Sequence, residues 1–227
     1  MNQQSKNDVI QIACGILFDF SFTLLDKWGE IADMILYGNK RFSYKYFPNI
    51  STYYTTERRL FNEKDGHEFR LSANNMIYTH VVQSSFTKEY TDFVDRITEG
   101  LLPDIFEKYR LSAVRTGVVY TCAVTDASIK EFREKYFKDE FSSITDFRFA
   151  KKEASREGNS KANSSDYINK IYTSIPKDDG GNLLSFDYQH HYLPHRGVIE
   201  KKVIKDFFEQ SKNALNNEIL SLGVNNG

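Results

Sequence analysis

The densest group of residues that could do chemistry lies near the C-terminal end of the sequence. Its members are Asp187, His190, His191 and His195. Carboxylate and imidazole groups are the ligands that zinc and similar ions take from proteins. On a strand, Asp187 and His191 share one face while His190 lies on the other, because successive side chains alternate. A metal site there needs a further ligand, for which His67 or His80 is available; the alternative is a polar strand end.

The sequence does not indicate nucleophilic catalysis. Cys14 and Cys122 fall on the apolar positions of alternating segments, where a thiol is usually inert packing. The chain has neither a Gly-x-Ser-x-Gly motif nor a glycine-rich phosphate loop. We therefore expect a non-enzyme without a cofactor, with an enzyme or metal site around Asp187 and His191 as the alternative. Two buried thiols suit the reducing cytoplasm, where we expect the protein.

Two segments, 40–46 and 147–152, interleave basic and aromatic residues. Cations and rings on a sheet face can neutralise phosphates and stack bases. The nucleic-acid contacts would be Arg41, Lys45, Arg148 and Lys151. Strand alternation puts the rings of the first segment on one face and its cations on the other, which is typical of a core face and a solvated face. With a net charge of −1, nucleic-acid binding is an alternative function.

The sequence has 14 tyrosines, and aromatic hydroxyls around a curved sheet can line a pocket. The candidates to bind a ligand are Tyr44, Tyr46, Tyr78, Tyr120 and Tyr188. These rings can equally pack in the core with their hydroxyls at the surface. We interpret the chain as a non-catalytic binding or adaptor protein. Its partner would be a protein or a small ligand, held in a groove between sheet and helices.

Two alternating segments must position these side chains. Every even position over 10–24 is apolar, and apolar residues alternate again over 114–124. Strict period two predicts strands with one buried face. Gly15 and Gly117 lie in the first half of these strands, where a glycine suits a bulge or a bend.

Helical patterns accompany each strand. Asp26 and Asp126 can cap short helices, because a carboxylate there accepts the free N–H groups of the first turn. Long amphipathic patterns cover 86–109 and 198–222. Pro103 lies inside the first long pattern and predicts a kink or break.

The elements follow the order strand, helix, three strands and long helix, twice over. This order predicts two pseudo-symmetric units, residues 1–110 and 111–227, that form one compact domain by internal duplication. The expected fold class is α+β, with a curved, mainly antiparallel sheet packed on long helices in a helix-grip or saddle-like arrangement. The alternative is an α+β chain whose rhythm is accidental.

Composition restricts the remaining classes of protein. The 227 residues are 40% hydrophobic and 27% charged, which is ordinary for a soluble globular protein. The start, residues 1–8, is polar, and no long stretch is uniformly apolar. We therefore expect neither a signal peptide nor a membrane span.

Two short motifs carry a resemblance to a known family. They are Arg115-Thr116-Gly117-Val118-Val119-Tyr120 and Leu184-Ser185-Phe186-Asp187-Tyr188. The chain resembles a sporadically distributed prokaryotic family of uncharacterised proteins, whose central strand has an Arg-x-Gly-x-x-Tyr pattern. The family often has Asn two residues after the tyrosine, where this sequence has Cys122. The resemblance implies a layout of strands and helices and no activity.

Overall fold

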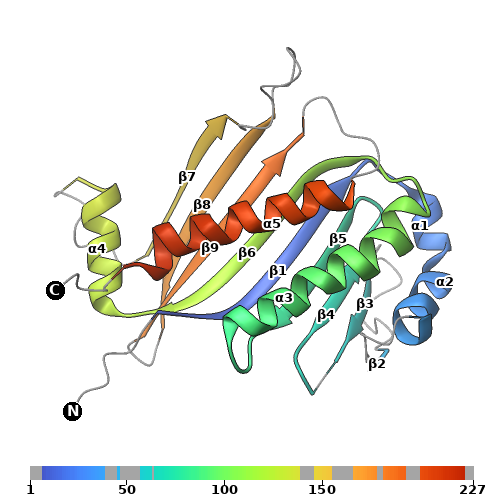
Figure 1. Ribbon diagram of the computed structural model, residues 1–227, viewed down its shortest axis with the longest axis horizontal. Helices are drawn as coiled ribbons and strands as arrows, with labels where there is room; N and C mark the ends of the chain where they lie inside the picture. The colour runs from blue at the N-terminus through green and yellow to red at the C-terminus, as the bar shows by residue number, and fades with distance from the viewer. Residues whose placement is uncertain are drawn as a thin grey trace.

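Two long strands lie side by side at the centre of the sheet, β1 (Asp8–Phe18) and β6 (Ala113–Val124). The computed structural model describes residues 7–38, 45–46, 57–62, 64–138, 146–154, 166–177, 181–192 and 200–222. Within them, nine strands form one curved antiparallel sheet in the order β2-β3-β4-β5-β1-β6-β9-β8-β7 (Figure 1). The other strands are β2 (Lys45–Tyr46), β3 (Arg58–Phe61), β4 (Glu68–Leu71), β5 (Asn75–Val81), β7 (Phe147–Ala154), β8 (Tyr167–Pro176) and β9 (Asn182–His191).

The strands of the two halves pair in the same order. β1 pairs with β5, the last strand of the first half, and β6 pairs with β9, the last strand of the second half. Further out, β4 and β3 take the places that β8 and β7 take on the other side. The α+β class predicted from the sequence is confirmed. The pairing order is compatible with an internal duplication, which stays a prediction, as do the helix-grip description and the two units 1–110 and 111–227.

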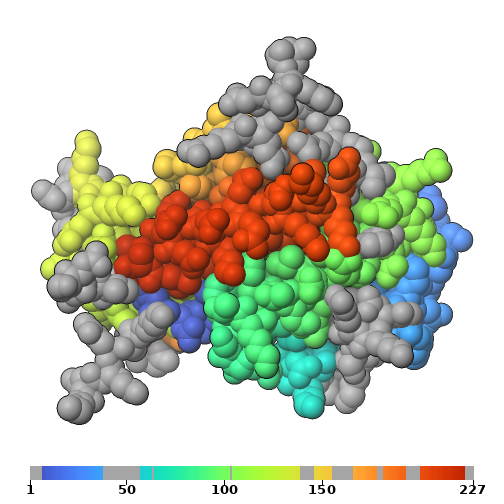
Figure 2. Space-filling view, viewed as in Figure 1, coloured from blue at the N-terminus to red at the C-terminus, as the bar shows by residue number. Residues whose placement is uncertain are grey.

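The helices lie on one side of this sheet. α3 (Phe86–Arg96) continues as the π-helix η2 (Ile97–Glu107), and Figure 1 shows it beside α5 (Lys201–Leu215) across the central strands. In the space-filling view of Figure 2 the two helices are packed against each other. The shorter helical elements are α1 (Phe22–Asp26), α2 (Trp28–Asp33), η1 (Met34–Gly38), α4 (Asp126–Tyr136) and η5 (Asn216–Leu220).

Ring contacts show that the outer helices pack on the same face. Trp28 of α2 stacks on Phe69 of β4, and Phe132 of α4 contacts Tyr172 of β8. Phe69 pairs with Tyr78 in the sheet, on the face that α3 covers. Among the described residues, no helix packs on the opposite face. We call that face, formed by the odd-numbered positions 11–17 of β1, 115–123 of β6 and the residues paired with them, the open face.

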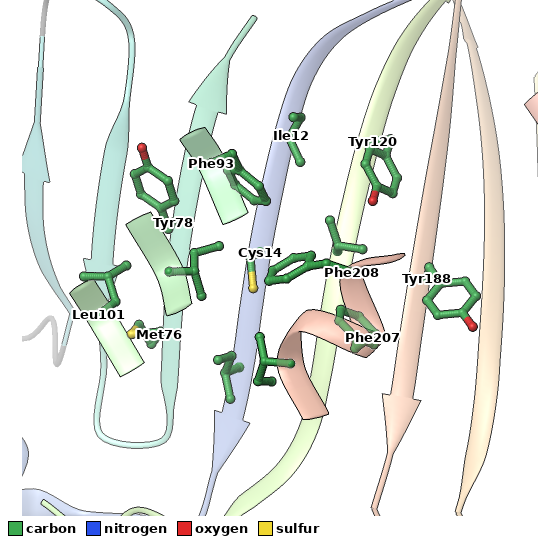
Figure 3. Packing of buried hydrophobic residues seen from close by; sticks show 14 of the residues in the cluster. Ile12, Cys14, Met76, Tyr78, Phe93, Leu101, Tyr120, Tyr188, Phe207 and Phe208 are labelled. Carbon is green, nitrogen blue, oxygen red and sulfur yellow. The ribbon is translucent and has the colours of Figure 1, made fainter. Parts of the chain in front are cut away.

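The apolar core lies between the sheet and the helices. Ile12, Cys14 and Tyr120, at even-numbered positions of the central strands, are at most 1% exposed. Phe93 of α3 and Phe208 of α5 meet above them, with ring centroids 5.7 Å apart (Figure 3). The period-two alternation in the sequence therefore separates a covered face from the open face, as predicted.

The end of the first strand was predicted wrongly. β1 ends at Phe18, whereas the alternation continues to residue 24. Ser21 precedes α1, so Phe20 and Phe22 are 61% and 68% exposed instead of buried on a strand. Asp26 is the last residue of α1 and not a helix cap. In the second half the cap is Thr125, one residue before Asp126, because its side chain accepts from the backbone N–H of Ser128.

Irregularities in the backbone also lie elsewhere than expected. The ladder between β1 and β6 shifts register at Val9/Gln11 and at Leu17/Phe18, and it is regular at the glycines. The long helical pattern changes from α-helix to π-helix at Ile97, and Pro103 lies inside the π-helical part.

Candidate functional site

Three of the five tyrosines predicted to bind a ligand are core residues. Tyr78, Tyr120 and Tyr188 are at most 5% exposed and lie between the sheet and the helices (Figure 3). The Tyr120 hydroxyl lies 2.7 Å from Ser211 Oγ, and burial raises the pKa of Tyr120 well above its usual value. Tyr44 and the side chain of Tyr46 lie outside the described residues. The buried rings fill the space of the predicted groove, and neither surface hollow described below includes them.

The predicted metal ligands Asp187 and His191 do share a face, the open face of β9. Gln189 lies between them: its Nε2 donates to Asp187 Oδ2 at 2.6 Å, and its Oε1 lies 3.0 Å from His191 Nε2. His195 lies outside the described residues. Within those residues, no group of three or more His, Cys, Asp or Glu side chains could hold a metal ion. An amide, and not a third metal ligand, thus lies between the pair.

The basic residues predicted to contact nucleic acid do not form one described surface. Arg148 is exposed on the open face, whereas Lys151 lies on the other face of β7, 2.7 Å from Glu153 Oε1. Arg41 and the side chain of Lys45 lie outside the described residues.

The ring of Tyr167, which could stack on a base, already has partners within the protein. On the open face of β8, Tyr167 stacks on His191 of β9 with ring centroids 4.4 Å apart. Lys152 Nζ of β7 lies 3.7 Å from the centre of the Tyr167 ring. Because β7 and β9 lie on opposite sides of β8, both faces of this ring have partners within the protein.

A hollow of about 280 Å³ lies in the middle of the open face. Its floor contains Gly15 and Gly117, which pair directly across β1 and β6. Because glycine has no side chain, the backbone is uncovered at this point. Ala13, Ile77 and Val119 provide apolar walls.

Charged and polar side chains of five further positions complete this hollow. Arg70 of β4, Arg115 of β6 and Asp187 of β9 line it, together with the amides of Asn75 and Gln189. Burial raises the pKa of Asp187, against the hydrogen bond from Gln189 and the positive charge of Arg115. The arrangement combines two guanidinium groups with one carboxylate in a concave site, which is the pattern expected of a binding pocket for a small polar molecule.

The two arginines differ in their partners. Arg115 makes no hydrogen bond or ion pair with the described residues, although its charge acts on both Asp187 and His191. Arg70 lies 3.7 Å from Glu68 Oε2 and 3.9 Å from Glu57 Oε1. Its Nε is buried and has no hydrogen-bond partner in the part of the chain that the structure describes. Arg115 is therefore the guanidinium that is available for an anion.

A second hollow, of about 650 Å³, lies where the N-terminal end of α3 meets α5. Ser84, Lys212 and Asn216 are among its lining residues. Ser84 and Lys212 both have partners: Glu89 accepts from the backbone N–H and the hydroxyl of Ser84, and Lys212 Nζ lies 4.9 Å above the Tyr90 ring. This hollow is the weaker candidate, because its cation is already engaged.

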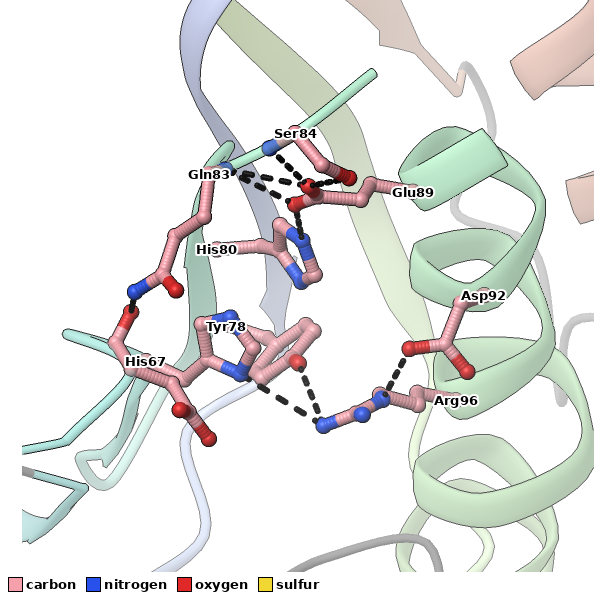
Figure 4. A network of polar contacts seen from close by, with 9 residues as sticks. His67, Tyr78, His80, Gln83, Ser84, Glu89, Asp92 and Arg96 are labelled. Atoms are coloured by element: carbon pink, nitrogen blue, oxygen red, sulfur yellow. Dashed lines mark hydrogen bonds and ion pairs between the residues drawn. The ribbon is translucent and has the colours of Figure 1, made fainter. Parts of the chain in front are cut away.

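A network of polar contacts ties the β4–β5 hairpin to α3 (Figure 4). His67 and His80 stack with ring centroids 4.0 Å apart, and His80 Nε2 lies 2.9 Å from Glu89 Oε2. Arg96 donates to Tyr78 Oη at 3.4 Å and lies 3.5 Å from His67 Nδ1. Burial, reinforced by the charges of His80 and Arg96, lowers the pKa of His67 to about 4. The network joins the helix to the sheet, and its His67, His80, Tyr78 and Arg96 line neither of the two hollows.

Sequence patterns single out some residues of the central hollow, but they do not predict that these residues lie together. Asp187 was a candidate metal ligand, and Arg115 and Gly117 belonged to the central motif. Arg70 was missed. The available signal was the open-face side of the same alternation, where glycine, alanine and charged residues replace the large apolar ones.

Comparison with known proteins adds no identity: no family model matches the chain, and no curated protein is similar to it at a significant level. The family resemblance drawn from the two motifs therefore stays a prediction. Within the described residues, no helix is long and apolar enough to cross a membrane.

Proposed function

We propose that this protein binds a small anionic molecule in the central hollow of the open face. The observation that carries the proposal is Arg115, a guanidinium that lines a concave site and has no hydrogen-bond partner among the described residues. Guanidinium groups bind carboxylate and phosphate through parallel hydrogen bonds. This moves the binding site predicted between sheet and helices to the other face of the same sheet.

The same geometry supports binding without chemistry. Apart from the carboxylate of Asp187, the described residues that line the hollow include no side chain that could act as a nucleophile or base. Cys14 and Cys122 are buried on the covered face, and burial raises the pKa of Cys122 to about 12. Both thiols are free and shielded, which suits the cytoplasmic location that belongs to the proposal.

Calorimetric titration with acetate, isobutyrate, succinate and inorganic phosphate tests the site. At least one of these anions should bind the wild-type protein saturably, and Arg115→Gln should weaken that binding at least tenfold. Arg148→Gln is the matched control, because Arg148 is an exposed arginine on the same face. It does not line the hollow, and its charge acts on Asp187 only from outside. The affinity of this variant for the anion should stay within twofold of the wild type.

Filling the hollow provides the second arm of this test. A Cβ at position 117 would lie 3.6 Å from Gln189 Cγ and 3.7 Å from Asp187 Oδ1, which are ordinary contacts. Gly117→Val should therefore fold and lose the anion. Anion binding that survives Gly117→Val, or no anion binding tighter than about 10 mM in the wild type, contradicts the proposal.

A further inference from the structure

The central hollow has a positive charge at Arg115 and a negative charge at Asp187. Arg115 pairs with His191, Gly117 with Gln189 and Val119 with Asp187 in the ladder of β6 and β9. Arg115 and Asp187 thus stand on either side of Gly117 along the strand direction. Their side chains line one hollow with the bare glycine between them, and no ion pair joins them. A small molecule lying on Gly117 would meet a cation at one end and a carboxylate at the other.

One oxygen of Asp187 is available to such a molecule. Oδ2 accepts from Gln189 Nε2 at 2.6 Å. Oδ1 accepts no hydrogen bond from the described residues and lies 3.7 Å from the point where a Cβ on Gly117 would be. That point is inside the hollow, directly above its floor. A positively charged donor placed there would pair with a carboxylate that is partly withdrawn from water, where such pairing is strong.

The cationic end is stronger than the anionic end. Arg115 supplies a guanidinium without a partner among the described residues, and Arg70 adds a second one on the far side of β5 and β1. Glu57 and Glu68 lie near Arg70 and reduce the positive charge that it contributes to the hollow. A carboxylate is therefore best placed at Arg115, where it can accept two parallel hydrogen bonds.

Size and wall chemistry restrict the rest of the molecule. A volume of about 280 Å³ lies just below the range of roughly 300–1,000 Å³ found for pockets that hold drug-sized ligands. The walls at Ala13, Ile77 and Val119 are apolar. They suit a short aliphatic group.

We propose that the hollow binds an α-amino acid with a short aliphatic side chain, its carboxylate on Arg115 and its ammonium group on Asp187. This inference rests on the proposed function, because it gives the class of the small anion. It also assigns roles: Arg115 and Asp187 read the two charges, and Gly117 keeps the floor low enough for the ligand to reach both. Asp187 thus serves to select the ligand and not to hold a metal ion.

The test compares molecules that differ by one charge. L-alanine, L-valine and L-leucine are titrated into the full-length protein, together with N-acetyl-L-valine, which lacks the ammonium group, and L-valinamide, which lacks the carboxylate. At least one amino acid should bind, and N-acetyl-L-valine and L-valinamide should each bind at least tenfold more weakly than L-valine. Asp187→Asn should weaken amino-acid binding at least tenfold. It should not weaken isobutyrate binding, because it removes a negative charge that faces Arg115 in the hollow.

The outcomes separate this inference from the proposed function. If N-acetyl-L-valine or isobutyrate binds as tightly as L-valine and Arg115→Gln abolishes that binding, the amino-acid inference is overturned and anion binding stands. If no amino acid, no carboxylate and no inorganic phosphate binds the wild type, both fail. If L-valine still binds Gly117→Val with unchanged affinity, the ligand lies elsewhere and both fail again. Circular dichroism and the melting temperature establish that each variant is folded before titration.

Discussion

Gly15 and Gly117 face each other across the two central strands of the sheet, in unbroken register. They occupy the positions predicted for a bend, and no register shift occurs at either of them. Neither residue has a side chain. Two adjacent glycines leave a depression in a surface that neighbouring side chains, Arg115 and Asp187 among them, surround. Neither glycine has a positive φ that other residues rarely adopt, so the structural effect of the pair is the hollow.

Alanine at either glycine should therefore stabilise the fold. A Cβ on Gly15 would meet only Ile77 Cγ1, at 3.9 Å, and one on Gly117 would meet its neighbours at 3.6 Å or more. Glycine inside a strand costs roughly 0.5–1 kcal/mol relative to alanine. Gly15→Ala and Gly117→Ala should each raise the free energy of unfolding by about 0.5 kcal/mol, as measured by urea denaturation.

Gly66→Ala is the control for this prediction. Gly66 has φ of +69°, and a Cβ there would lie 3.0 Å from Val81 Cγ2. Both features are unfavourable for alanine, so this variant should lose about 1 kcal/mol or more. A loss of stability in all three variants would mean that the central glycines are also needed for the backbone.

The helix cap at Thr125 should contribute measurable stability. Its Oγ1 accepts from the backbone N–H of Ser128 at 3.1 Å at the start of α4, so Thr125→Ala should cost about 1 kcal/mol. Ser85 occupies the corresponding position before α3 and makes no such side-chain bond. Ser85→Ala should cost only a few tenths of a kcal/mol. Equal losses in chemical denaturation would contradict this account of the two caps.

The hydroxyl of Tyr120 should stabilise the contact between sheet and α5. It lies 2.7 Å from Ser211 Oγ, and Ser211 in turn donates to the Phe208 carbonyl at 2.8 Å. Removing the buried hydroxyl in Tyr120→Phe should cost about 1–2 kcal/mol. A double-mutant cycle with Ser211→Ala should give a coupling of about 1 kcal/mol. Strict additivity of the two changes would show that the hydrogen bond adds nothing.

The covered face was easier to predict than the site. Even positions of β6 alternate through the full strand, so its length and buried face follow from the sequence. The same pattern runs past the true end of β1, because Phe20 and Phe22 are apolar but exposed. Alternation counts polarity and cannot tell a buried ring from an exposed one. The tyrosines predicted to line a groove are core residues for a related reason. A period of two identifies the covered face, but it does not show whether space remains between that face and the helices.

The hollow could not be predicted, because it depends on register between distant segments. Each glycine was noted, but their pairing joins positions about one hundred residues apart and follows only from the ladder of β1 and β6. Asp187 is a candidate metal ligand in the sequence because of its carboxylate. In the structure it instead lines a hollow with Arg115 and Gln189. Gln189 donates to Asp187 from two residues further along β9, and Arg115 lines the same hollow from β6. In these surroundings Asp187 fits a ligand contact better than a metal site.

Binding of single-stranded nucleic acid should be weak. The ring of Tyr167 is held between Lys152 and His191, so stacking on a base requires that these contacts be broken first. A mobility-shift assay with a single-stranded oligonucleotide at physiological salt should give a dissociation constant no tighter than about 100 µM. Tighter binding that is lost on Arg148→Glu with Lys152→Glu would instead support a nucleic-acid function for the open face.

Stability should fall as the pH is lowered from about 6.5 to about 4, because of His67. This side chain is 7% exposed, stacks on His80 and lies near Arg96, so a proton on it is unfavourable. Burial and these two charges lower the pKa of His67 to about 4, whereas the unfolded chain takes up its proton near the ordinary value of about 6.5. Between these values the unfolded state binds more protons, and acidification favours it.

The loss from His67 should be on the order of 2 kcal/mol between pH 7 and pH 4. Glu89 stays charged in this window: burial alone would raise its pKa, but hydrogen bonds from Ser84, His80 and Gln83 lower it to about 2. Urea denaturation at several pH values should therefore show a smaller loss in His67→Gln than in the wild type. Burial also lowers the pKa of His191 to about 4, so a residual loss of the same sign is expected. An unchanged pH dependence in His67→Gln would contradict the assignment, because the proton responsible would then bind elsewhere.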